Sequence, residues 1–223
     1  MSLIGIIYSL YYLMIHFNES KVSGKKYEQL RTIYEKSESE DESQQLAGIN
    51  DDYVGWLSVD GTDIQYPVVL GQDNDFYLTH NFYKEEDRAG AIFMDYRNSG
   101  DHLDFHTIIY GHNMKDKSMF ANLGEVLDGK FSSTNHIRFE FKNQTYEWEI
   151  FSAYITRETD WMDVDFKSDH DSENFIQSIT NKSSRAFSNE FAENNQIITL
   201  ATCTNFATDE RVVVHAKLIK GNE

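Results

Sequence analysis

The chain has 223 residues, of which 40% are hydrophobic and 14% aromatic, so it can form one folded domain with a short extension. Its formal net charge is −17 at pH 7 and it has no Lys/Arg cluster, which argues against a nucleic-acid partner, because such proteins neutralise phosphates with a basic face. It contains one cysteine, so no internal disulfide forms, and an unpaired cysteine in an exported protein suggests a reactive thiol.

The N-terminal segment, residues 1–17, is strongly apolar. A helix over residues 3–17 is roughly 22 Å long, which is short of the roughly 30 Å core of a bilayer. The segment has neither a basic leader nor a small-residue cleavage site. We interpret it as the remnant of a membrane anchor, with a buried or surface helix as the alternative.

The next region, residues 18–48, is polar and charged. Four apolar side chains in it recur at helical spacing and predict an amphipathic helix. They are Tyr27, Leu30, Ile33 and Tyr34. Residues 37–45 are acidic and serine-rich, and we expect a solvated helix end or a linker there.

From residue 49 onward the sequence is typical of short strands separated by turns. Alternating apolar and polar residues mark some strands, and short apolar runs mark others. The predicted strands lie at 56–60, 64–70, 91–94, 107–110, 137–141, 146–150, 197–200 and 212–219. Residues 142–145 are expected to join two of these strands as a hairpin. About eight strands at this density predict a mainly β fold, with a closed or nearly closed β-barrel over residues 49–223.

One helix is predicted in the second half of the chain. Ser168 and Asp171 have the spacing of a capping box, and Phe175, Ile176 and Ile179 form an apolar stripe. The expected fold is therefore a barrel with a helical N-terminal region and a further helix before the strand that carries the cysteine.

Three residues that can carry acyl-transfer chemistry stand at predicted strand ends. Cys203 follows one strand, His112 follows another, and Arg211 opens the last strand, eight positions after Cys203. The thiol is a candidate nucleophile, the imidazole a candidate general base and acid, and the guanidinium a candidate donor to an oxyanion. Simpler roles stay open for each: a buried apolar cysteine, a loop-bonded histidine, and an ion pair of Arg211 with Asp209 or Glu210.

The sequence blocks around these residues resemble those of the sortase family. Residues 199–203 read Thr-Leu-Ala-Thr-Cys and resemble the TLxTC signature of sortases, while Arg211 and His112 match the family's other two reactive residues. The resemblance covers residues 27–220. Further blocks resemble class B sortases: Val54-Gly55-Trp56, Tyr66-Pro67-Val68-Val69, Asp73-Asn74-Asp75-Phe76-Tyr77-Leu78, Gly90-Ala91-Ile92-Phe93-Met94-Asp95 and Ser118-Met119-Phe120-Ala121-Asn122-Leu123.

This resemblance implies a cysteine transpeptidase on the outside of Gram-positive bacteria, held in the cell membrane by a single N-terminal anchor. Residues 49–223 are its implied catalytic barrel, which needs no metal or organic cofactor. Sortases cut a C-terminal sorting signal of the LPxTG or NPxTx kind after threonine and form a thioacyl-enzyme. They then pass the acyl group to an amine. The implied partners are surface proteins bearing such a signal, a peptidoglycan precursor or cell-wall peptide amine, and the membrane.

The same resemblance assigns a role to each candidate residue. Cys203 is the nucleophile, His112 protonates the leaving amine and deprotonates the incoming one, and Arg211 stabilises the oxyanion. Further residues are predicted to line the substrate groove: Tyr110, Ala201, Thr202, Asn74 and Leu78. For Asn74 the alternative is loop capping, and for Leu78 it is packing in the core.

Other interpretations of the sequence remain open. A thiol hydrolase, which transfers the acyl group to water, would use the same three residues. A surface-anchored barrel with a degenerate site would be a binding module without catalytic activity. A zinc site is a further alternative, built on His102, His106 and His112 with Asp101 and Asp104 nearby, although no helix places two of them on one face. In addition, residues 204–210 form a loop that looks short for class B and carries two acidic residues beside Arg211. That loop puts the preferred sorting motif in doubt.

Overall fold

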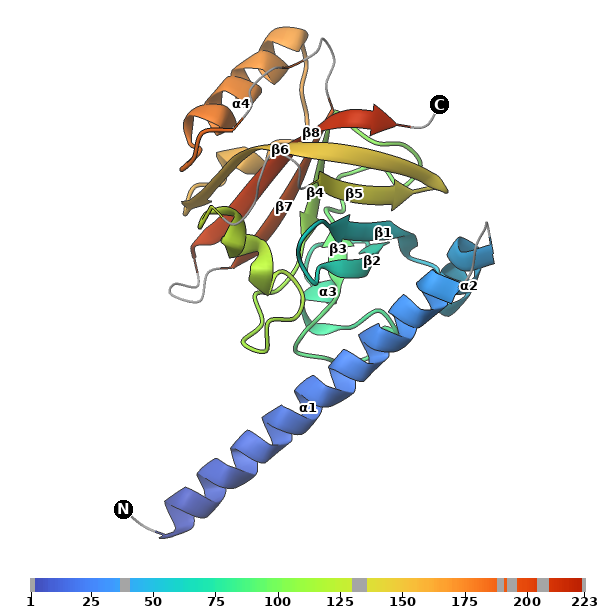
Figure 1. Cartoon of the computed structure of the whole chain (residues 1–223), viewed down its shortest axis with the longest axis vertical. Coiled ribbons are helices and arrows are strands. Elements are labelled where there is room, and N and C mark those ends of the chain that lie inside the picture. Colours follow the sequence, from blue (N-terminus) through green and yellow to red (C-terminus); the bar gives the residue numbers. More distant parts are fainter. Residues whose placement is uncertain are drawn as a thin grey trace.

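The fold is a closed barrel of eight strands in a computed structural model that describes residues 3–36, 41–129, 136–187, 191, 196–203 and 209–221. The strand order around the barrel is β1-β2-β3-β4-β7-β8-β6-β5 (Figure 1). The strands are β1 (Tyr53–Val59), β2 (Gln65–Leu70), β3 (Ile92–Met94), β4 (His106–Tyr110), β5 (His136–Phe141), β6 (Gln144–Thr156), β7 (Ile197–Cys203) and β8 (Arg211–Gly221). The predicted mainly β barrel is confirmed, and each predicted strand falls on one of these.

The hairpin between β5 and β6 is tighter than the sequence predicted. Its turn consists of Lys142 and Asn143, with φ angles of 50° and 63°, whereas residues 142–145 were expected. Two positive φ angles are typical of the two-residue turns that match the twist of paired strands. Gln144 and Thr145 already pair with β5, so the prediction was wrong at that end of the loop.

The barrel wall is buried on both faces near the cysteine strand. Ile198 and Leu200 of β7 face the barrel interior, while Ile197 and Ala201 face a second apolar cluster beneath α4 (Asp169–Asn181). Burial on both faces explains why this strand is a continuous apolar run without alternation. The predicted cap of α4 is confirmed, because Ser168 Oγ accepts a hydrogen bond from the Asp171 N–H at 3.2 Å.

Two helices precede the barrel, α1 (Leu3–Lys36) and α2 (Asp41–Ile49), and α1 projects away from the barrel toward the N-terminus (Figure 1). The predicted apolar stripe of α1 packs on the barrel, where Tyr27 and Leu30 are buried and the Tyr34 ring stacks on Trp56 at 4.1 Å. Residues 37–40 of the predicted acidic linker lie outside the described residues. Within the described part of the chain, no helix is both long enough and apolar enough to cross a membrane.

Short helices complete the fold around one end of the barrel. They are α3 (Phe76–Thr79) and two 3-10 helices at Ala121–Val126 and Asp160–Met162. The first and the last of these lie in the loops that flank the cavity described below.

A chain of buried hydrogen bonds crosses the cluster beneath α4. His106 Nδ1 donates to the Asp163 carbonyl at 2.6 Å, and a carbonyl only accepts, so His106 Nε2 accepts from the Thr199 hydroxyl at 2.6 Å. His215 Nδ1 then donates to Thr199 Oγ1 at 2.7 Å, and the Tyr154 hydroxyl donates to His215 Nε2 at 3.0 Å. Every donor in this series of hydrogen bonds has an acceptor when both histidines are neutral.

Burial keeps these histidines uncharged. It lowers the pKa of His106 to about 4, against the hydrogen bond to the Asp163 carbonyl, which raises it. Burial also lowers the pKa of His215 well below its ordinary value, and neighbouring His106 adds to that effect. The unfolded chain therefore takes up protons near pH 6.5 while the folded chain does not.

We expect the free energy of unfolding to decrease as the pH falls from 6.5 toward 4. Over that range the unfolded state binds more protons, so His106 alone lowers stability by about 2 kcal/mol between pH 7 and pH 5. Urea unfolding at both pH values measures this loss. The His106→Gln variant removes one titrating group and should show a smaller loss; an equal loss in variant and wild type contradicts the assignment.

Candidate active site

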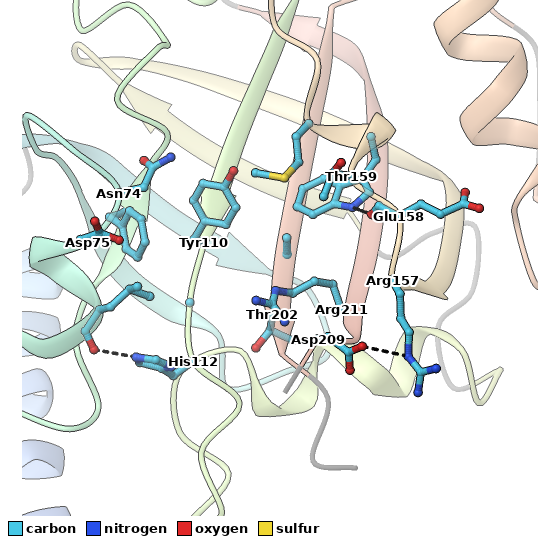
Figure 2. A pocket seen from close by; sticks show the side chains of 16 residues that line it. Asn74, Asp75, Tyr110, His112, Arg157, Glu158, Thr159, Thr202, Asp209 and Arg211 are labelled. Carbon is cyan, nitrogen blue, oxygen red and sulfur yellow. Dashed lines mark hydrogen bonds and ion pairs between the residues drawn. The ribbon is translucent and has the colours of Figure 1, made fainter. Parts of the chain in front are cut away.

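A cavity of about 290 Å³ lies where β4 and β7 end and β8 begins. Figure 2 shows Tyr110 between two walls, with Asn74 and Asp75 on one side and Glu158 and Thr159 on the other. The cavity lining includes every predicted site residue whose side chain the structure describes. Those residues are His112, Arg211, Tyr110, Ala201, Thr202, Asn74 and Leu78.

Cys203 is the last residue of β7, and its backbone pairs directly with Arg211 at the start of β8. Directly opposed residues of antiparallel strands have Cα atoms about 5 Å apart. The expected return of the chain from Cys203 to Arg211 therefore occurs. The side chain of Cys203 and residues 204–208 lie outside the described residues.

His112 stands in the loop after β4, and two contacts fix its place. The Gly111 N–H donates to the Ala201 carbonyl at 3.2 Å, which ties this loop to β7. His112 Nε2 donates to the Leu78 carbonyl at 2.6 Å, drawn as a dashed line in Figure 2. A carbonyl only accepts, so Nε2 carries the ring proton in this contact.

Arg211 lines the cavity, and its Nη1 donates to the Glu210 carbonyl at 3.0 Å. The acidic residues beside it pair with a different arginine. Arg157 contacts Asp209 at 3.4 Å and Glu210 at 2.9 Å, and Figure 2 shows the first of these ion pairs. The structure therefore shows ion pairs of these two carboxylates with Arg157, in the loop after β6, where the sequence had left open an ion pair with Arg211.

The remaining predicted groove residues have distinct environments. Asn74 lines the cavity and also caps a loop: its Nδ2 donates to Asp95 at 3.1 Å, and its Oδ1 accepts from the Tyr96 N–H, in the loop after β3, at 3.0 Å. Leu78 is 36% exposed, so it borders the cavity and is not packed in the core. The Thr202 hydroxyl is buried and has no hydrogen-bond partner among the described residues. It is the kind of group that a bound peptide can satisfy.

One wall of the cavity, the loop between β6 and α4, was not predicted from the sequence. Its members in the lining include Arg157 and Met162, together with Trp161, whose Nε1 donates to the Glu158 carbonyl at 2.8 Å. The Trp161 ring lies 6.4 Å from the ring of Tyr110, at an angle of 62°. No motif marks this segment, so only the fold reveals that it faces the cysteine strand.

The three histidines of the zinc alternative take separate partners. His106 uses both ring nitrogens in the buried chain beneath α4, and His112 binds the Leu78 carbonyl. His102 lies on the surface near Asp104, at 3.6 Å. Over the described ranges of the chain, no group of three His, Cys, Asp or Glu side chains is placed to hold a metal ion.

Gly90 lies close to His112 and to the Leu78 carbonyl that His112 binds, and it has a φ of +60°. A Cβ at this position would lie 2.5 Å from the Tyr77 carbonyl, 3.0 Å from the Leu78 carbonyl and 3.2 Å from His112 Cδ2. We expect Gly90→Ala to lower the free energy of unfolding by about 2 kcal/mol, since it combines a left-handed backbone with a clash. The Leu78 carbonyl must then move, so peptide cleavage should decrease at least about tenfold.

Gly124→Ala is the matched control, because a Cβ there meets nothing within 4 Å and the residue lies in a short 3-10 helix. Urea unfolding and peptide cleavage are measured for both variants. Wild-type cleavage in folded Gly90→Ala would show that the position of His112 does not depend on this contact.

Comparison with known proteins shows the family of the chain. The sortase domain family matches residues 57–219. Sortase B of Listeria monocytogenes is 42% identical over 188 residues, which are 82% of this chain and 76% of that protein. Sortase B of Staphylococcus aureus is 34% identical over 220 residues, which are 94% of this chain and 90% of that protein.

Solved structures give the same result. Sortase B from B. anthracis in complex with AAEK1 superposes with a TM-score of 0.84 at 38% identity, over 92% of this chain and 99% of that one. A Staphylococcus aureus sortase B–substrate complex has a TM-score of 0.83 at 34% identity, over 91% and 98%. The chain therefore belongs to the sortase family of cysteine transpeptidases, within the sortase B group.

Proposed function

We propose that this enzyme cleaves a C-terminal sorting signal of the LPxTG or NPxTx kind after threonine and transfers the acyl group to a cell-wall peptide amine. One observation carries the proposal: the backbone of Cys203 pairs with Arg211, and His112 and Arg211 line the same cavity. A nucleophile, a proton carrier and an oxyanion donor are the groups that acyl transfer through a thioester requires.

In the first half of the proposed reaction the Cys203 thiolate attacks the threonine carbonyl carbon. A carbon–sulfur bond forms, and the carbonyl oxygen becomes an oxyanion that the Arg211 guanidinium stabilises by charge-assisted hydrogen bonds. The carbon–nitrogen bond then breaks, and the leaving amine takes a proton from protonated His112. The product of this half is a thioacyl-enzyme and a free C-terminal fragment.

In the second half an acceptor amine attacks the thioester carbon. His112 takes a proton from the incoming nitrogen, the carbon–sulfur bond breaks, and the Cys203 thiolate is restored. Water competes for the same thioester, so the acceptor must displace or outpace it. The proposed acceptor is the amine of a peptidoglycan precursor or cell-wall peptide.

The cavity suits an extended peptide with an apolar residue. Leu78, Phe93 and Trp161 supply apolar lining, while Thr202 and Arg211 supply hydrogen-bonding groups near the cysteine. Ligand sites commonly combine a mainly apolar lining with a few fixed polar groups. The Staphylococcus aureus sortase B–substrate complex shares this fold, which supports the proposal of a peptide substrate.

The test is incubation of the full chain with peptides of the LPxTG, NPxTx and SPxTG types, with and without an amine acceptor, followed by chromatography of the products. The proposal expects cleavage after threonine and an amide product that forms only with the amine. An identical hydrolysis product in both conditions would make the chain a thiol hydrolase. Absence of cleavage with every peptide would leave a barrel that binds without catalysis.

We further propose that the N-terminal part of α1 attaches the enzyme to the cell membrane, with the barrel outside the cell. Four of its apolar side chains are exposed, and burying them in lipid is favourable. They are Ile7, Tyr8, Tyr11 and Met14. Full-length chain should sediment with membranes and a chain that begins at residue 18 should not; equal sedimentation of the two contradicts the proposal.

A further inference from the structure

Asp95, directly after β3, is a buried carboxylate that contacts two residues of the cavity lining, Tyr110 and Asn74. Its side chain is 0% exposed and accepts hydrogen bonds from Arg97 Nε at 2.8 Å and Arg97 Nη2 at 2.7 Å. It also accepts from the Tyr110 hydroxyl at 2.8 Å and from Asn74 Nδ2 at 3.1 Å. The carboxylate therefore joins Tyr110 to Asn74, which stands on one wall of the cavity.

Arg97 extends this connection to the opposite wall. Its Nη2, which binds Asp95, also donates to the Met162 carbonyl at 3.0 Å, in the loop between β6 and α4. Met162 and Asn74 both line the cavity, and Met162 belongs to the same loop as Glu158 and Thr159, which Figure 2 shows on the side of Tyr110 opposite Asn74. A planar guanidinium can bridge a carboxylate and a carbonyl in fixed directions, whereas an ammonium group is a point charge.

The charge state of the pair suits this role. Burial raises the pKa of Asp95, but hydrogen bonds from Arg97 and Tyr110 outweigh it and hold the pKa below its ordinary value. Burial, together with the neighbouring Asp95 charge, raises the pKa of Tyr110, so its hydroxyl remains a donor. At neutral pH Asp95 and Arg97 are thus joined by two charge-assisted hydrogen bonds, which are stronger than bonds between neutral groups.

The loop between β6 and α4 is held at two successive carbonyls. Arg97 binds that of Met162, and His106 Nδ1 binds that of Asp163 at 2.6 Å. Loss of the Arg97 contact therefore leaves one attachment in place. The expected consequence is a loosened wall within a folded barrel.

We propose that Asp95 and Arg97 form a positioning pair that sets the separation of the two cavity walls and thereby the affinity for the sorting-signal peptide. The inference rests on the proposed function for its substrate, and on the contacts above for its mechanism. Neither residue lines the cavity, so both act through Asn74, Tyr110 and Met162. Displacing groups that contact the peptide removes binding energy that the ground state and the transition state share, which raises KM and leaves kcat little changed.

The test is Arg97→Lys, which keeps a positive charge beside the buried Asp95 but cannot bind both Asp95 and the Met162 carbonyl with one planar group. KM for the cleaved peptide should rise about tenfold while kcat changes little, because the wall is displaced and the reactive residues are not. Iodoacetamide alkylation of Cys203 should keep its wild-type rate. Amide hydrogen exchange of residues 157–163 should become faster.

Arg138→Lys is the matched control. Arg138 is a half-buried arginine paired with Asp60 and Glu147, and its strand β5 lies opposite β4 in the barrel. This variant should leave KM and the exchange of residues 157–163 unchanged. Tyr110→Phe is a second variant that removes only the hydroxyl bound to Asp95, and it should raise KM in the same direction.

The outcomes separate this inference from the proposed function. Faster exchange with unchanged KM in Arg97→Lys would overturn the role in peptide affinity, and unchanged exchange would overturn the attachment of the loop itself. If the wild type cleaves no peptide, the proposed function fails, while the exchange measurement still decides whether Arg97 holds this wall.

Discussion

Replacing Cys203 by alanine is expected to reduce transpeptidation by on the order of 10,000-fold or more, because the thioacyl bond then has no atom to form on. The barrel should stay intact, since alanine is smaller than cysteine and Cys203 stands at the end of β7. Peptide cleavage with an amine acceptor measures the loss, and urea unfolding checks the fold. Retained turnover in folded Cys203→Ala would rule out the covalent mechanism.

The Cys203→Ser variant tests whether activity is lost because the nucleophile is lost or because the volume of the side chain changes. Serine preserves the size of the side chain but presents a hydroxyl, which is a far weaker nucleophile than a thiolate at neutral pH. We expect it to be inactive while it still binds peptide. Peptide affinity in both variants, measured by fluorescence anisotropy, should remain near that of the wild type.

Arg211→Lys should reduce kcat/KM on the order of 100-fold, the usual loss when one oxyanion donor is removed. Lysine keeps the positive charge, so the loss measures the contribution of the planar guanidinium that we propose as the oxyanion donor. Steady-state kinetics with the cleaved peptide is the measurement. Near-wild-type kcat/KM would show that a positive charge alone is enough and that no directed hydrogen bond is involved.

Arg157→Lys is the control for this prediction. Arg157 also lines the cavity, but its guanidinium contacts the carboxylates of Asp209 and Glu210. Exposed ion pairs of this kind contribute little energy. A loss equal to that of Arg211→Lys would indicate a general effect of cavity charge and contradict a specific role for Arg211.

Much of the barrel is predictable from local patterns. Continuous apolar runs such as residues 197–200 and 212–219 identify strands buried on both faces, and Ser168 identifies the start of α4. Tyr27 and Leu30 identify the face of α1 that packs on the barrel. These features depend on residues close together in the sequence, where periodicity and capping rules apply.

The parts that escaped prediction depend on contacts between distant segments. In the sequence, Asp95 and Arg97 are an acidic and a basic residue two positions apart, with no motif that marks them. Only the fold brings Met162 to Arg97. The same holds for His106, whose neighbours in sequence suggested a metal ligand and whose partners are Thr199 and the Asp163 carbonyl. Charged residues carry little periodic signal, so their partners emerge only with the tertiary structure.

The most direct test of the central claim is intact-protein mass spectrometry of the enzyme after brief incubation with a cleaved sorting-signal peptide. In the absence of an amine we predict an added mass equal to the N-terminal acyl fragment, and proteolytic mapping should place it on Cys203. Addition of the amine should remove that mass and yield the amide product. Cleavage without an adduct on Cys203, or an adduct that the amine does not discharge, would contradict the account.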